Sequence, residues 1–285
     1  MRWLQAFQTP VCTSRILAGR LQPFQTPART SRILRWLLIA LAASTVLLYL
    51  FMPARLAVYV LQSRIDPLAL ADVHGDAWNG ESRSTHWGER SLGHLVWNAD
   101  PLAAWTGAVR TDLHFQLPKN QRMDAHVERR FGTLEVTALR ADLVGGALRK
   151  FFARARLLPI GSIHLDVAHA RFDEGVPVAV QGRAWWRQAT LVGPRTRLPY
   201  YLGDLQVDFF VDRPGIVLGR IRDSGGAMQV AGTVKADVVG YRIELRIAPR
   251  DPQLAQGLTR LGQAQPDGSR LLVLQDAWWW KRRHG

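Results

Sequence analysis

The chain has a single cysteine, Cys12, and no aspartate or glutamate precedes its one long apolar run. One thiol cannot form an intrachain disulfide, so burial of apolar side chains has to hold the fold together. The sequence also lacks Gly-x-Ser-x-Gly, His-Glu-x-x-His and phosphate-loop motifs, and it has no cysteine cluster. These absences argue against hydrolase, metalloprotease and nucleotide-dependent activities. We therefore predict that the chain is not an enzyme and has no catalytic residue, metal site or cofactor.

The apolar run from Trp36 to Met52 indicates in which cellular compartment the rest of the chain lies. Its 17 residues carry no charge. At about 1.5 Å per residue they cover roughly 26 Å of a hydrocarbon core that is about 30 Å thick. Six arginines precede the run, so the positive-inside rule places the N-terminus in the cytoplasm. We predict a transmembrane helix over residues 36–53 and an exported domain over residues 54–285, with 54–62 continuing the helix as a stalk.

A cleaved signal peptide is the alternative to this anchor. The apolar core of a signal peptide has about 7–15 residues and ends in a small-residue cleavage site. This run is longer and ends in Phe51-Met-Pro-Ala-Arg55, and no cysteine follows it as a lipoprotein anchor would require. The sequence favours an uncleaved anchor.

Residues 1–35 contain a duplication, because Gln5–Leu17 returns as Gln22–Leu34 after a shift of 17 residues. Two proline-containing copies with few apolar side chains cannot build a core, so we predict a disordered basic cytoplasmic tail, with a docking role as the alternative. The formal net charge of the chain is +14, which is often a sign of nucleic-acid binding. DNA is not expected beyond the membrane, so we predict no nucleic-acid partner. Solvated strand faces explain the charge better than attraction to anionic head groups.

Beyond the run, apolar side chains alternate with polar ones, which is the pattern of antiparallel strands with one buried face. The alternation is clear in six segments, 109–117, 163–167, 176–180, 205–211, 228–234 and 241–247. Turn signals such as Gly145-Gly146 and Pro159-Ile-Gly161 separate the segments. We predict an all-β domain in which an antiparallel meander forms a curved open sheet or a partial barrel.

Helix signals are few in the exported part. Asp251-Pro252 places an N-cap before a proline and Gly262 can end the helix, which predicts one short helix near the C-terminus. Asp100-Pro101 similarly opens a short turn that Gly107 stops.

Tryptophan is abundant, with 11 residues in 285, and such side chains serve as core anchors or as interface hot spots. Trp78 lies between Gly75 and Gly80, and we expect it to be a buried plug because glycines let strands approach closely. The run Trp278–Trp280 cannot face one side of a strand, so at least one of its rings is expected to pack outside its own sheet.

Without a nucleophile–base pair, we expect the domain to work by adding strands or faces to partners. Its edges are expected to be blunted by arginines at outward positions. The examples in the sequence are Arg110, Arg242 and Arg246.

Several short motifs occur in an order that resembles protein N of the type II (general) secretion pathway. Val73-His-Gly-Asp-Ala-Trp-Asn-Gly80 is similar to that family's Gly-x-x-Trp-x-Gly signature, and Asp223-Ser-Gly-Gly-Ala-Met-Gln-Val-Ala-Gly232 resembles its Asp-x-Gly-Gly-x-Leu-x-Leu-x-Gly hairpin. Further segments match in order: Leu95–Trp97 with Asp100–Leu102, Gln181–Trp186, Leu198–Gly203, Ile247–Arg250 and Leu258–Gly262. The resemblance rests on residues that we expect to be structural, namely Gly75, Trp78, Gly80, Trp97, Pro101, Gly182, Trp186, Gly203, Gly225, Gly226, Gly232, Pro249 and Gly262.

The resemblance implies an inner-membrane component of the machinery that moves folded periplasmic proteins across the outer membrane of Gram-negative bacteria. It implies a non-catalytic scaffold with its bulk in the periplasm. Its partners would be other bitopic inner-membrane subunits, with the outer-membrane secretin as a further candidate. The alternative is an inner-membrane-anchored periplasmic lipid-binding or lipid-transfer protein, because a curved sheet lined with apolar side chains can hold acyl chains. An apolar groove that is open over many strands would favour lipid, and a filled concave face would favour the scaffold.

Overall fold

A computed structural model describes residues 28–63, 68–88, 90–193, 199–251, 258 and 261–278. The chain forms two compact units, Met1–Tyr49 and Leu50–Gly285. The first contains helix α1 (Ala28–Leu50), in which Ile33–Leu50 is long and apolar enough to cross a membrane. Within α1, Thr45 Oγ1 donates a hydrogen bond to the Leu41 carbonyl (2.8 Å), so this hydroxyl is satisfied inside the helix.

Helix α1 starts and ends earlier than the sequence pattern indicates. Residues 28–35, which we expected in a disordered tail, are helical, and the rest of that tail, residues 1–27, lies outside the described residues. Residues 54–62 are helical as expected, but they do not continue α1, because Pro53 separates α1 from a second helix, α2 (Ala54–Gln62). Pro53 is extended, with φ −66° and ψ 140°, and proline has no N–H with which to continue a helix.

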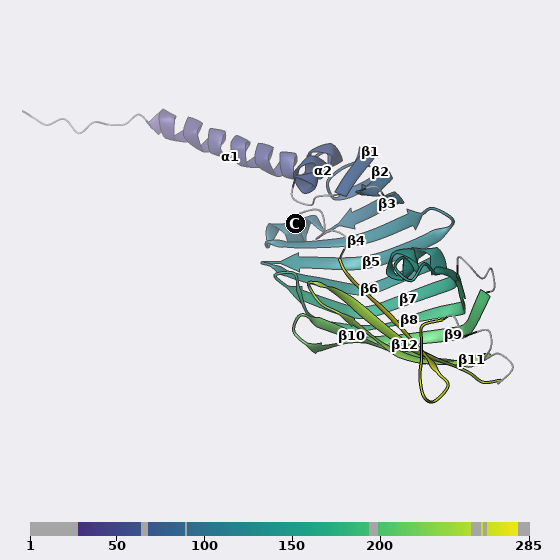
Figure 1. Ribbon diagram of the computed structural model, residues 1–285. Helices are drawn as coiled ribbons and strands as arrows, with labels where there is room; N and C mark the ends of the chain where they lie inside the picture. Colours follow the sequence, from purple (N-terminus) through teal and green to yellow (C-terminus); the bar gives the residue numbers. More distant parts are fainter. Residues whose placement is uncertain are drawn as a thin grey trace, which may run out of the picture. The chain divides into compact units, whose positions relative to one another are not determined.

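The second unit is built on one antiparallel sheet of fourteen described strands, which follow chain order except that β14 lies between β12 and β13 (Figure 1). The strands are β1 (Leu68–Gly75), β2 (Asn79–Trp87), β3 (Arg90–Ala99), β4 (Ala108–Leu117), β5 (Gln121–Arg130), β6 (Thr133–Val144), β7 (Leu158–Asp173), β8 (Val176–Val192), β9 (Pro199–Arg213), β10 (Ile216–Asp223), β11 (Met228–Ala236), β12 (Gly240–Pro249), β13 (Gln263–Ala264) and β14 (Arg270–Ala277). The edges β1 and β13 do not pair with each other, so the sheet is open. The predicted antiparallel meander is confirmed.

Helix α2 covers one edge of this sheet. Ala54 and Val58 are buried against Val73 of β1, with Leu70 at the border of the cluster. Gln62 Nε2 donates a hydrogen bond to the Leu70 carbonyl (3.1 Å). Because β1 is an edge strand, the helix shields an edge that would otherwise be open to pairing.

One face of the sheet is apolar and the other is charged. A single row of cross-strand neighbours runs along the apolar face from β1 to β14: Val73, Ser82, Leu95, Phe115, Met123, Ala141, Leu165, Ala184, Val207, Ile221, Gly232, Leu245 and Leu272. A slip of one residue between two strands would turn the apolar set of a strand to the solvent. The alternation that predicts the strands therefore also fixes their register.

The apolar face is filled between β7 and β14. A short connection between β6 and β7, made of η1 (Gly145–Leu148) and α4 (Arg149–Phe152), lies on this face. Phe152 packs against Trp186 of β8 with ring centroids 6.0 Å apart, and Phe151 packs against Tyr241 of β12 at 4.9 Å. Since β8 and β12 are far apart in strand order, the sheet has to curve around this connection (Figure 1). Fully buried side chains of the core include Leu191, Leu202, Val230 and Ile247.

The composition of Pro159-Ile-Gly161 predicts a turn. In the structure this segment lies inside β7 instead. The register of β7 against β8 shifts between Ile160 and Ser162, and Gly161 has a φ of 122°. A glycine in this conformation is as suited to a β-bulge as to a turn. The turn signal is therefore used to bend a long strand.

The short helix expected after Asp251 is not among the described helices, which are N-terminal and mid-chain. Most of its residues, 252–257, 259 and 260, lie outside the described part of the chain. Leu258 and Leu261 are 1% and 2% exposed and belong to the core of the sheet. The helix α3 (Pro101–Trp105) forms as predicted, and Asp100 accepts a hydrogen bond from the Leu102 N–H (2.8 Å).

Candidate functional site

The corner between β1 and β2 contains the first family motif. The Asp76 carboxylate accepts hydrogen bonds from the N–H groups of Trp78 (2.8 Å) and Asn79 (2.6 Å), which makes an Asx turn. Gly75 precedes it with a φ of 93°, in the left-handed region that glycine adopts without a steric cost. The motif therefore specifies a tight reversal of the chain.

The aromatic plug at this corner is Trp97 rather than Trp78. Trp78 and Trp97 are both half-buried, and what distinguishes Trp97 is its contact with Gly80. Trp97 on β3 pairs in register with Gly80, and a Cβ on Gly80 would overlap its ring. Trp97 Nε1 also donates a hydrogen bond to the Ala77 carbonyl (3.3 Å). The space beside Gly80 is filled by a tryptophan ring, as expected, but the ring is that of Trp97 on the neighbouring strand.

The same corner holds the segment that follows α1. The Ala77 N–H donates a hydrogen bond to the Met52 carbonyl (2.8 Å), and Pro53 forms a β-bridge with Asp76. Met52 and Pro53 lead directly into α2, which is buried on β1. The motif thus supplies the joint between the linker and the sheet.

A second group of motif glycines lets two turns meet. Gly203 has a φ of 86°, and a Cβ placed on it would lie 2.8 Å from the Gly225 carbonyl oxygen. A Cβ placed on Gly226 would lie 3.2 Å from Gly203 Cα. On Gly232 a Cβ would overlap the Glu244 carbonyl. These positions require glycine because backbone lies where a side chain would be.

The remaining motif residues are also structural and are spread along the sheet. Trp186 is 7% exposed, and its indole N–H donates a hydrogen bond to the Ile160 carbonyl (2.9 Å). Pro101 occupies the first turn of α3. The others lie at close approaches or strand ends: Gly182 beside Val167, Pro249 opposite Met228, and Gly262 against Leu271. The motif residues are not gathered around one pocket.

Asp223 holds the turn between β10 and β11 and was absent from the expected site residues. Its carboxylate accepts hydrogen bonds from the N–H groups of Gly225 (3.2 Å) and Val230 (3.1 Å) and from Arg250 (2.5 Å). Burial acts to raise the pKa of Asp223, but the hydrogen bonds from Val230 and Arg250 outweigh it and the pKa is lowered. Its place two residues before Gly225 is an Asx-turn signal that sequence reasoning could have used.

The charged face carries rows in which acidic and basic residues alternate from strand to strand. One row of cross-strand neighbours is His114, Asp124, Arg140, Asp166, Arg183, Asp208 and Arg220. Three histidines form contacts of 2.7 Å with carboxylates of the next strand: His114 with Asp124, His126 with Asp112, and His164 with Asp142. Many of the charged residues of this face are therefore paired across strands, as expected for solvated strand faces.

Asp208 is the most strongly perturbed acid on this face. Its carboxylate accepts hydrogen bonds from Arg183 (2.8 Å), Arg222 and Gln206 (3.0 Å). The bond from Arg183 contributes most, and together the three donors lower the pKa of Asp208 to about 2. This carboxylate on β9 thus links Arg183 of β8 to Arg222 of β10.

The arginines expected to blunt the edges do not lie at edges. Arg110 is on β4 and pairs with Glu128 (3.0 Å), while Arg242 and Arg246 are on β12 and pair with Glu244 (2.6 Å) and Asp267 (3.6 Å). Both strands are interior to the sheet. The described edge at β1 is instead protected by α2.

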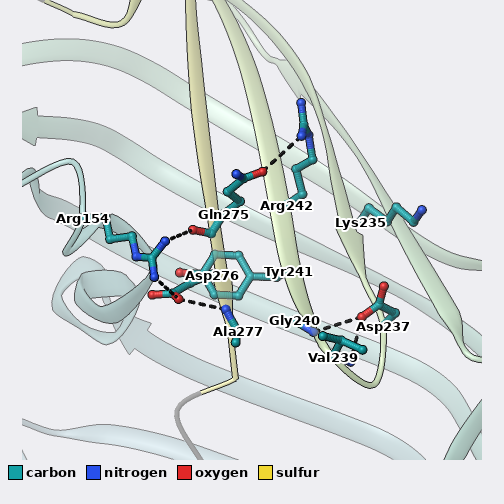
Figure 2. A pocket seen from close by; sticks show the side chains of 10 residues that line it. All are labelled: Arg154, Lys235, Asp237, Val239, Gly240, Tyr241, Arg242, Gln275, Asp276 and Ala277. Atoms are coloured by element: carbon teal, nitrogen blue, oxygen red, sulfur yellow. Dashed lines mark hydrogen bonds and ion pairs between the residues drawn. The ribbon is translucent and has the colours of Figure 1, made fainter. Parts of the chain in front are cut away.

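A cleft of about 490 Å³ lies between the end of α4 and strands β11, β12 and β14 (Figure 2). Arg154 forms an ion pair with Asp276 (2.8 Å) and donates to the Gln275 carbonyl (3.5 Å). Arg242 donates to Gln275 Oε1 (3.1 Å). The full lining is Arg154, Lys235, Asp237, Val239, Gly240, Tyr241, Arg242, Gln275, Asp276 and Ala277. Arg154, Arg242, Gln275 and Asp276 are paired with one another, and no histidine, serine or cysteine lines the cleft.

Trp278 adjoins this cleft. Its ring packs against Tyr241 with centroids 5.5 Å apart, and its Nε1 donates a hydrogen bond to the Asp237 carbonyl (2.6 Å). The remaining tryptophans of the run, Trp279 and Trp280, lie outside the described residues. Across the described ranges, no three His, Cys, Asp or Glu side chains come together as metal ligands.

The concave face does not form an open groove from β7 to β14, because buried side chains fill it. On β4 and β5 the inward residues Leu113, Phe115 and Met123 are half-buried. The filled face that the sequence analysis associated with a scaffold is therefore present from β7 to β14, and the part of the face on β4 and β5 is only half-covered.

Comparison with known proteins identifies the family. The family model described as type II secretion system (T2SS), protein N, matches residues 66–273, which is well over half of the chain and includes every strand from β2 to β13. No curated protein and no solved structure matches the chain significantly. A sheet whose motif glycines and tryptophans serve its folding, without a catalytic or metal constellation in the described residues, agrees with a family that is generally a non-catalytic secretion component. The chain belongs to the type II secretion system protein N family.

Proposed function

We propose that the chain is a non-catalytic scaffold of the type II secretion machinery, anchored in the bacterial inner membrane by α1 with its sheet in the periplasm. The family match over residues 66–273 is the observation that carries this proposal. The apolar stretch Ile33–Leu50 supports the anchor. The arginines before it support a cytoplasmic N-terminus.

The scaffold acts by presenting surfaces to other bitopic inner-membrane subunits and supports the export of folded proteins across the outer membrane. The paired charges of the outer face and the core that fills the inner face from β7 to β14 support a role in binding rather than in chemistry. Beyond Leu271, no second strand pairs with β14 in the described part of the sheet. On that side of β14, Arg154 donates a hydrogen bond to the Gln275 carbonyl, so a partner strand that adds there by β-augmentation has to displace this arginine.

Affinity purification of the full chain from cross-linked membranes of its host tests the proposal. Recovery of other inner-membrane subunits of the secretion machine, in amounts comparable to the bait, is expected. Mass spectrometry of the same sample reads out lipid. Stoichiometric lipid without secretion subunits would overturn the scaffold and support the lipid carrier.

A further inference from the structure

Helix α2 has two apolar faces although only one of them is buried. Ala54 and Val58 face β1. On the opposite side of the same helix, Leu56 is 54% exposed, Tyr59 is 74% exposed and Val60 is 55% exposed. Positions 56, 59 and 60 are spaced by three and four residues, so their side chains adjoin one another on the helix surface.

This surface is unlike the solvent-facing side of an ordinary helix. A helix that packs one face on a sheet normally carries charged and polar residues on the other. Here the outer side carries Leu, Tyr and Val, with Arg55 at its flank. Phe51, in the turn before the helix, is also apolar and is 74% exposed. A contiguous exposed apolar patch marks a binding surface.

The short distance along the chain between the candidate span and α2 indicates what covers this patch. The candidate span ends at Leu50 and α2 begins at Ala54, so the three residues between them reach at most about 14 Å. The linker cannot lengthen by releasing α2, because Met52 and Pro53 are bonded to the corner at Asp76 and Ala77. If α1 crosses a bilayer, α2 has to lie at the surface where α1 emerges.

We propose that α2 is an interfacial helix, with Leu56, Tyr59 and Val60 inserted at the boundary between head groups and acyl chains of the membrane that α1 spans. The Tyr59 ring suits this depth because it is apolar with a polar tip, and Arg55 can extend to lipid phosphates. Since α2 is also the cover of β1, the first edge of the sheet is held at the membrane surface. This inference rests on the membrane anchor of the proposed function. It adds that the exposed surface of α2 binds lipid.

Site-directed spin labelling of the full chain in bilayer nanodiscs tests the inference. Cys12→Ser removes the only native thiol, and single cysteines are then placed by Tyr59→Cys, Val60→Cys, Leu41→Cys in α1 and Tyr201→Cys. Tyr201 is the matched control, because it is a tyrosine on β9 with 62% exposure. The collision rate of each label with oxygen, relative to a water-soluble nickel complex, reports its depth.

Labels at 59 and 60 are expected to collide with oxygen several-fold more, relative to nickel, than the label at 201, and to lie about 5–10 Å below the head-group surface. The label at 41 should lie deeper still. Labels at 59 and 60 that behave like the one at 201 would overturn the inference, and so would labels shielded from both reagents, which is the signature of a protein contact. A water-accessible label at 41 would instead overturn the anchor, so failure of the two proposals is distinguishable.

Discussion

Gly80 and Trp97 show how a family motif acts at the scale of single residues. The glycine carries no function of its own, but the ring on the next strand occupies the volume of its absent side chain. A ring that fills a glycine gap on a neighbouring strand stabilises the strand pair. The motif therefore serves to pack the sheet around the segment that links it to α1.

Gly80→Ala should lower the free energy of unfolding by about 1–3 kcal/mol, because the new methyl group displaces the Trp97 ring. Gly146→Ala is the matched control, since the nearest atom to its virtual Cβ is a side-chain carbon 3.9 Å away. Urea unfolding of both variants in detergent gives the two values. Equal stabilities for the two variants would show that Trp97 is not held against Gly80.

Asp208 gives a prediction for pH. Its pKa is depressed to about 2 in the folded chain, against about 3.9 when unfolded. Its contribution to stability is therefore complete above about pH 4 and is lost as the pH falls toward 2. Asp208→Asn should be less stable than the parent at pH 7, and the difference should shrink between pH 4 and pH 2. Thermal melts over this range measure it, and a difference that grows at low pH would contradict the assigned hydrogen bonds.

At the scale of elements, the connection formed by η1 and α4 is the part that closes the core. Phe152 is 3% exposed and joins β7 and β8 to β12 and β14 through one buried cluster. Sequence analysis identified only a turn at Gly145-Gly146, because a helical segment of four residues is too short to show a periodic pattern. The alternating strands, by contrast, were predictable because apolar and polar side chains alternate along them.

Phe152→Ala should cost about 3–5 kcal/mol of unfolding free energy, through the cavity left beside Trp186. Phe131→Ala is the control, because Phe131 is 87% exposed and surface changes usually stay within about 0.5 kcal/mol. Limited proteolysis of the two variants compares them. A Phe152 variant as protease-resistant as the Phe131 variant would show that α4 does not fill the core.

The C-terminal segment offers a second test at this scale. Trp278 is fixed to the turn between β11 and β12 by its contacts with Tyr241 and Asp237, whereas residues 279–285 lie outside the described part of the chain. Deleting residues 279–285 should leave the circular dichroism spectrum and melting temperature unchanged while reducing recovery of partner subunits. Unchanged recovery would place the binding surface elsewhere.

At the scale of the whole molecule, sequence patterns predicted the all-β fold class, the apolar helix near the N-terminus and the family. They did not predict that Trp97 replaces Trp78 as the plug, because the ring that fills a glycine gap is set by strand register and not by sequence spacing. They predicted a helix over residues 54–62 but not that it is separate from α1 and packs on β1, since its apolar residues continue the composition of the span and only Pro53 marks the break. The arginines were assigned to edges because outward position, but not strand order, can be read from alternation.

The most direct test of the whole account is the fate of a folded substrate of the secretion machine when the gene for this chain is deleted in its host. We predict that the substrate accumulates, folded, in the periplasm and falls at least tenfold in the medium, and that the full chain restores its release. The Cys12→Ser chain should restore it equally well, because no step uses the thiol. Undiminished release of the substrate from the deletion strain would contradict the assignment of this sheet to the export of folded proteins.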